Sequence, residues 1–270
     1  MPPDHPDAYL RQWRLARLVE ESGPPGTVLN AGDRTFALAS YLPDWQVITA
    51  DVHRPPRAGY PPSPDVHRPP RAGYPPSPAG RQPPFVQASP AARRPPFVQA
   101  DLTMAPLADG AVDVVVSTDV LEHLPAGRRA SFLAEAVRVA RRQVFIAFPA
   151  GPEAAVAEAL ILRSKSRRNF RAALQEHARF GLPQLGEVEA ALAGLRGAHT
   201  ITPLTTVAEW LTSFVFDEGD REDYGLLEDY CRLLNGTAAP IPGPGAVYRW
   251  LVVIDLTANT RMSSVAACGR

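Results

Sequence analysis

The run VDVVVST, from Val112 to Thr118, is the feature that most limits the folds open to this chain. A strand with one solvated face alternates apolar and polar residues, but this run is apolar on both faces. A strand buried on both sides needs helices above and below it, which is the situation inside a parallel sheet. The run therefore predicts a central strand of a helix-covered parallel sheet.

Shorter apolar runs of the same kind recur along the chain and alternate with helical patterns. Strands are predicted at 28–29, 46–50, 97–100 and 143–149, with helical patterns at 8–20, 35–42 and 132–140. Helical stretches follow around 152–180, 185–195, 206–216 and 223–235, and two late strands are predicted at 199–204 and 247–256. This alternation predicts an α/β fold: a Rossmann-like, doubly wound, mostly parallel sheet with helices on both faces and a helical C-terminal elaboration.

A proline-rich insert interrupts the pattern. The sequence DVHRPPRAGYPPSP occurs at 51–64 and again, unchanged, at 65–78, and PPFVQA occurs at 83–88 and 95–100. Fifteen of the 30 prolines lie between 52 and 96, and each removes a backbone donor that a sheet or helix interior needs. We expect a loop at 52–96 within an α/β domain spanning 27–256, an N-terminal helix in 1–26, a helical substrate or cap region at 151–245, and a flexible tail at 257–270.

Composition narrows the partners and the compartment. Lys+Arg and Asp+Glu are both 28, so zero net charge gives no electrostatic case for nucleic acid or an anionic membrane. The two cysteines, Cys231 and Cys268, fit no metal-binding spacing, and no metal site is expected. No secretory signal is recognised at the start, and no run approaches about 18 uncharged apolar residues. A cytoplasmic protein without a membrane span is the expectation.

Polar residues at the predicted strand ends are the candidates for ligand binding. In an open parallel sheet the ligand lies beyond the carboxyl ends of the strands, near the point where the strand order reverses. Asn30–Asp33 follow the first strand, Asp51 the second, Asp101 the third, and Ser117–Asp119 close the fourth. A carboxylate at such an end can accept two hydroxyl donors at once, which suits a ribose.

The order of these segments carries a family resemblance. VLNAG, ITAD, FVQADLTMAPLADGAVDVVVSTDVLEHLP and RVARRQVFIAFP, read in sequence, resemble bacterial class I S-adenosylmethionine-dependent methyltransferases, especially the type 11 kind. The resemblance covers 27–149 without the proline insert. It implies a methyltransferase with S-adenosylmethionine as cofactor. The sequence does not identify the methyl acceptor: a small molecule or a glycan or lipid precursor is the first expectation, and a protein side chain is the alternative.

The resemblance also implies roles for individual residues. The turn after the first strand would face the methionine part of the cofactor, Asp51 with Val52 beside it would hold the ribose, and Asp101 with Leu102 would contact the adenine. Ser117, Thr118 and Asp119 would line the cavity near the sulfonium. The implied cofactor-binding set is Asn30, Ala31, Gly32, Asp33, Asp51, Val52, Asp101, Leu102, Ser117, Thr118 and Asp119.

The chain departs from this family in the first turn, where only Gly32 remains of a glycine-rich motif. A methyltransferase-like binding protein without catalysis is therefore a second hypothesis. A nicotinamide-dependent oxidoreductase ranks last, because its fingerprint needs three glycines around a pyrophosphate. No catalytic residue is assigned. His123, Glu176 and His177 are weak acid/base candidates, with a structural histidine or a solvated helix face as the alternative reading.

Overall fold

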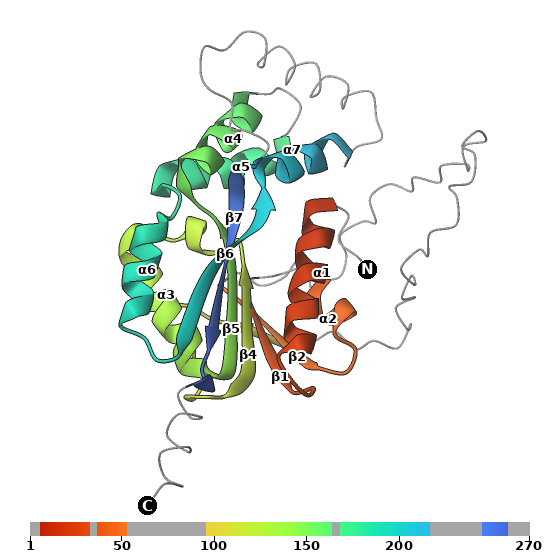
Figure 1. Cartoon of the computed structure of the whole chain (residues 1–270), viewed down its shortest axis with the longest axis vertical. Helices are drawn as coiled ribbons and strands as arrows, with labels where there is room; N and C mark the ends of the chain where they lie inside the picture. Colours follow the sequence, from red (N-terminus) through yellow and green to blue (C-terminus); the bar gives the residue numbers. More distant parts are fainter. Residues whose placement is uncertain (1–5, 33–36, 53–95, 164–167, 217–244, 259–270) are drawn as a thin grey trace, which may run out of the picture.

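The computed structural model describes residues 6–32, 37–52, 96–163, 168–216 and 245–258. Within them lies a seven-stranded sheet in the order β3-β2-β1-β4-β5-β7-β6 (Figure 1). The strands are β1 (Thr27–Ala31), β2 (Gln46–Asp51), β3 (Phe97–Gln99), β4 (Val112–Thr118), β5 (Ala140–Pro149), β6 (Ala198–Thr206) and β7 (Val247–Asp255).

The strand order reverses at β1, which lies between β2 and β4. From β1 the chain runs outward through β2 to β3 and then returns to β4 on the other side, and all of these pairs are parallel. β5 continues the parallel sheet, and β7 pairs antiparallel with both β5 and β6. The reversal between β1 and β4 creates the crevice in which ligands of open α/β sheets bind.

Helices cover both faces of the sheet. They are α1 (Pro6–Glu21), α2 (Ala37–Tyr41), the short 3₁₀ helix η1 (Leu121–His123), α3 (Ala126–Val139), α4 (Gly151–Arg163), α5 (Arg168–Phe180), α6 (Leu185–Ala193) and α7 (Val207–Phe216). Figure 1 shows α1 and α2 on one side of the sheet and α3 and α6 on the other, with α4, α5 and α7 gathered beyond the carboxyl ends of the strands.

The sheet residues divide between two apolar layers because successive side chains of a strand point to opposite faces. Val114 and Val116 of β4 pack in the layer beneath α1 and α2, whereas Val115 packs in the layer beneath α3 and α6. All three valines are no more than 1% exposed. The apolar run in the sequence is therefore explained by a strand covered on both faces.

The doubly wound α/β fold predicted from the sequence is confirmed, and the predicted strands and most helices agree with the structure to within a few residues. The helix expected at 223–235, nearly all of the proline-rich loop and most of the tail fall outside the described residues. In the part of the chain that the structure describes, no helix is both long enough and apolar enough to cross a bilayer.

We expect Phe132→Ala to lower the free energy of unfolding by about 3–5 kcal/mol, because it leaves a cavity in the layer beneath α3. Phe132 is 1% exposed and belongs to that apolar cluster. The measurement is urea denaturation followed by circular dichroism. Ser131→Ala, at the exposed neighbouring position, is the control and should change stability by less than about 0.5 kcal/mol. Equal stability of the two variants would contradict this packing.

Candidate functional site at the carboxyl edge of the sheet

The predicted cofactor-binding residues that the structure describes lie on four adjacent strands at one edge of the sheet. The amide of Gly32, just after β1, donates to the carbonyl of Ala50 at 2.7 Å, and the amide of Ala100 donates to the carbonyl of Asp51 at 3.0 Å. Ala31 pairs with Ser117 across β1 and β4. The ends of β1 to β4 are thus held side by side, while Asp33 lies outside the described residues.

Gly32 occupies a position that only glycine fits. Its φ is +90°, a conformation that side chains with a Cβ rarely adopt. A Cβ built there would lie 2.1 Å from Cγ2 of Val120 and 3.9 Å from Cδ1 of Leu102. The single glycine that survives in this turn is therefore required by the backbone conformation and by the close approach of Val120, just after β4.

Several polar side chains at this edge are buried. Asp51 is 8% exposed at the end of β2, and Asn30 and Ser117 have no exposed surface. The Ser117 hydroxyl has no hydrogen-bond partner among the described residues. A buried polar group of this kind is uncommon and marks a place where a ligand group or water can bind.

Asp101 is already engaged by neighbouring groups. One carboxylate oxygen accepts hydrogen bonds from the Thr103 amide at 2.9 Å and the Thr103 hydroxyl at 2.8 Å. The other accepts one from the Arg128 guanidinium at 2.6 Å. The Arg128 hydrogen bond and then the Thr103 hydrogen bonds lower the pKa of Asp101 to about 2. The carboxylate stays ionised at physiological pH, and an adenine amine would have to share it with Arg128.

Asp119 forms an ion-pair network at the end of β4. Both of its oxygens accept hydrogen bonds from Arg249 of β7, at 2.8 and 3.0 Å, and Arg11 of α1 also pairs with it. Arg249 is 1% exposed, so its charge requires such a partner. Asp119 itself has a φ of +52°, which is uncommon outside glycine. The residue connects β4, β7 and α1 at the edge where the cofactor is predicted to bind.

The three weak catalytic candidates come together beside this edge. Nδ1 of His123, in η1, lies 2.8 Å from Oε2 of Glu176 in α5. Nε2 of His123 lies 3.2 Å from Nε2 of His177, and the two rings meet edge to face at a centroid distance of 4.5 Å. Nδ1 of His177 lies 2.9 Å from Oε1 of Glu158 in α4.

Glu122 lies next to this pair and has no exposed surface. Burial raises the pKa of its carboxyl to about 8. Burial, followed by the nearby His177, lowers the pKa of His123. One oxygen of Glu122 and one ring nitrogen of each histidine lie within 4.8 Å of one another. The cluster therefore holds an unusual concentration of titratable groups in a partly closed space.

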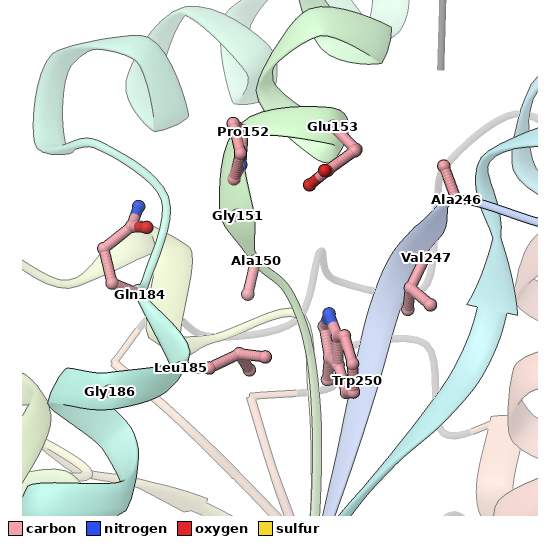
Figure 2. Close-up of a pocket in the computed structure, with 10 residues that line it drawn as sticks. All are labelled: Ala150, Gly151, Pro152, Glu153, Gln184, Leu185, Gly186, Ala246, Val247 and Trp250. Carbon is pink, nitrogen blue, oxygen red and sulfur yellow. The ribbon is translucent and has the colours of Figure 1, made fainter. Parts of the chain in front are cut away.

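A cavity of about 470 Å³ lies beyond the end of β5 (Figure 2). In Figure 2, Leu185 and Trp250 point toward the same space as Glu153 from the first turn of α4. The lining residues are Ala150, Gly151, Pro152, Glu153, Gln184, Leu185, Gly186, Ala246, Val247 and Trp250. None of them was predicted as a site residue. They lie at the starts of two helices and of a late strand, and this placement is too weak a pattern to predict a pocket from the sequence.

Three polar residues of the site were also missed. Arg249 lies in the otherwise apolar run VYRWLVVID, and Glu158 lies in AVAEALIL. A charge inside a buried stripe needs a partner, so each could have been flagged, but the partner could not be identified. Tyr248 donates its hydroxyl to Glu158 at 3.0 Å and carried no such signal.

Comparison with known proteins identifies the fold. Residues 82–148 match the model of a family described as a methyltransferase domain. A crystal structure of an S-adenosylmethionine-dependent methyltransferase from Archaeoglobus fulgidus has a TM-score of 0.52 and 13% identity, covering 91% of this chain and 93% of that one. The fold is that of the class I methyltransferases. The resemblance predicted from the sequence is thereby confirmed for the fold and for the match to a methyltransferase domain.

A second structure with the methyltransferase fold is geranyl diphosphate C-methyltransferase from Streptomyces coelicolor, crystallised with Mg²⁺, geranyl diphosphate and S-adenosyl-L-homocysteine. Its TM-score is 0.48 at 12% identity, with 94% of this chain and 83% of that one covered. No curated protein sequence matches the chain significantly.

We expect Gly32→Ala to lower the free energy of unfolding by at least about 2 kcal/mol, because it combines an unfavourable φ with overpacking against Val120. Urea denaturation measures this. Gly127→Ala is the matched control, since a Cβ at Gly127 meets nothing within 4 Å. It lies in the first turn of α3, where alanine should leave stability unchanged or raise it by up to about 1 kcal/mol. A Gly32→Ala protein as stable as wild type would refute the turn geometry.

The pairing of Asp101 with Arg128 should make part of the stability depend on acid pH. The pKa of Asp101 falls from an ordinary value of 3.8 to about 2 on folding, so its ionised form is favoured by the native state. This contribution is complete above about pH 4 and is lost as the pH falls toward 2.

A double-mutant cycle with Asp101→Asn, Arg128→Gln and the double variant, followed by urea denaturation from pH 6 to 2.5, tests this pairing. The coupling between the two sites should shrink as the pH falls below about 4. A coupling that is absent at pH 6, or unchanged at pH 2.5, would show that the pair does not form as described.

Proposed function

We propose that the chain is an S-adenosylmethionine-dependent methyltransferase. The observation that carries the proposal is the buried Asp51 carboxylate, which ends β2 beside the Gly32 turn at the reversal of strand order. A carboxylate there can accept both hydroxyl groups of a ribose, and the turn lets a ligand approach the backbone. The methyltransferase fold around these residues makes the ribose of S-adenosylmethionine the best candidate.

The other residues at the edge fit the remaining parts of the cofactor. Leu102, which packs beside Gly32, would lie against the adenine ring. The unpartnered Ser117 hydroxyl is available near the methionine part, where Asn30 and Ala31 also end β1. When bound, S-adenosylmethionine supplies an electrophilic methyl group on its sulfonium. The protein then has mainly to orient the acceptor and exclude water.

Two predicted contacts take a modified form in this proposal. Asp101 would accept the adenine amine on lone pairs left free by Thr103 and Arg128, since a carboxylate offers about four acceptor sites. Asp119 would shape the cavity through its pairing with Arg249 and Arg11, while its own charge is neutralised by them. Cofactor affinity thus depends on Asp51 more than on either of these residues.

A small-molecule acceptor, or the end of a glycan or lipid precursor, is supported by the cavity at the end of β5. Its volume of about 470 Å³ falls within the range of small-molecule sites. β5 is the direct neighbour of β4, so the cavity lies one strand from the proposed sulfonium position. His123, Glu176 and His177 are proposed as acid/base candidates only for an acceptor that must lose a proton.

The first test is isothermal titration of the purified protein with S-adenosylmethionine. We expect saturable binding that weakens at least tenfold in Asp51→Ala, because two hydrogen bonds to a buried carboxylate are lost. Asp44→Ala is the control, since Asp44 is an exposed aspartate in the turn before β2. This variant should bind S-adenosylmethionine with the affinity of the wild type. Absence of binding at millimolar cofactor, or equal affinity in Asp51→Ala, would refute the proposed site.

A turnover assay separates catalysis from binding alone. Release of S-adenosylhomocysteine in the presence of a small-molecule acceptor would support the enzyme. Tight cofactor binding without release across a broad acceptor panel would favour the methyltransferase-like binding protein instead. A nicotinamide cofactor is disfavoured because Gly32 alone cannot form the three-glycine phosphate turn.

A further inference from the structure

The histidine cluster beside the carboxyl edge is built from two separate parts of the chain. Glu122 and His123 form η1, immediately after β4, and His177 lies in α5. The two histidines are 54 residues apart in sequence. α5 lies beyond the strand ends in Figure 1, so the contact brings a residue of the C-terminal region against the predicted site edge.

Carboxylates determine the orientation of both imidazole rings. Glu176 accepts from Nδ1 of His123 at 2.8 Å. Glu158 accepts from Nδ1 of His177 at 2.9 Å and also from the Tyr248 hydroxyl at 3.0 Å. A carboxylate beside Nδ1 favours the tautomer of a neutral imidazole that carries its proton on that nitrogen, and this tautomer leaves Nε2 with a lone pair.

The two Nε2 atoms that remain face one another. They lie 3.2 Å apart, and two lone pairs at that distance repel unless a positive charge lies between or beside them. Two nitrogens bonded to one tetrahedral zinc ion at about 2.1 Å lie roughly 3.4 Å apart. The observed spacing therefore fits two ligands of one ion with little movement.

Glu122 supplies the third, independent observation. It has no exposed surface, and among the described residues neither carboxylate oxygen meets a hydrogen-bond partner apart from its own backbone amide. The positive charges of Arg249 and Arg11 act on the Glu122 carboxyl through space, and both arginines pair with Asp119. A buried acid without a partner carries a large desolvation cost, which a bound cation would remove.

We propose that Glu122, His123 and His177 bind one divalent transition-metal ion, with Zn²⁺ the best-matched. Two imidazole nitrogens and one carboxylate oxygen are a donor set used by zinc sites with an open position. The nitrogen donors disfavour Mg²⁺ and Ca²⁺, which prefer oxygen ligands. Glu176 and Glu158 then act as the carboxylates that orient metal-bound histidines, a role that such partners commonly have.

The surroundings give the ion access and an open coordination position. The His123 side chain is 32% exposed, whereas His177 is 6% exposed, so the site is reached from the η1 side. An ion held by three protein ligands keeps a further position for water or another oxygen ligand, which it polarises. The binding of the ion does not depend on methyl transfer.

The test is metal binding by the full-length protein after treatment with a chelator. Isothermal titration with Zn²⁺ should give one equivalent with a micromolar or lower Kd, and Zn²⁺ should raise the melting temperature. His177→Ala and His123→Ala should each weaken binding on the order of 100-fold, and Glu122→Gln, which keeps the shape, at least tenfold. His199→Ala, in β6 away from the cluster, should bind as wild type does.

A second measurement covers the case in which a substitution unfolds the protein. Co²⁺ added to the metal-free wild type should give the visible absorption of a four- or five-coordinate site, and one equivalent of Zn²⁺ should abolish it. No saturable Zn²⁺ binding by the wild type at micromolar concentration would overturn the proposal. Unchanged affinity in folded His123→Ala and His177→Ala proteins would overturn it equally, leaving a proton shared between the rings.

Discussion

The arrangement of the carboxyl edge depends on the ion pair between Arg249 and Asp119. An arginine with almost no exposed surface in an apolar strand is tolerated only if a carboxylate accepts hydrogen bonds from its guanidinium group. Asp119 provides that partner from the end of β4, and Arg11 adds a contact from α1. Asp119 thus fixes β4, β7 and α1 relative to each other. The three elements meet directly beside the predicted cofactor crevice.

The two proposed sites, which differ in their chemistry, meet around this ion pair. On one side are the Gly32 turn and Asp51, which suit the polar parts of a nucleoside. On the other are Glu122 and the paired histidines, which suit a cation. Both follow from strands that end at the same edge, so the parallel sheet brings distant segments of sequence into one region. The helices beyond the carboxyl edge contribute the side chains of the histidine cluster that the sheet does not supply.

Much of the fold could be predicted from the sequence because a strand that is buried on both faces is a continuous apolar run. The valines of β4 predicted a strand at the centre of the sheet, which the structure confirms. The polar residues that end each strand predicted where a ligand would bind. The contacts within that edge could not be predicted. Arg249 and Asp119 are 130 residues apart, and no periodicity indicates which charge meets which. For the same reason, the sequence suggested His123 and His177 separately, and the expectation that no metal site exists rested on cysteine spacing alone.

The position of β3 has a consequence for the connection that precedes it. This three-residue strand is at the edge of the sheet, and its register on β2 is set locally by the pairs from Thr49↔Phe97 to Asp51↔Gln99. The Gln99 side chain adds a hydrogen bond to the Val52 carbonyl at 3.0 Å. Whatever length of chain joins Val52 to Pro96, these last residues can find the same partners. The repeated stretch at 65–78 lies within this connection, and β2 and β3 keep their pairing with it present.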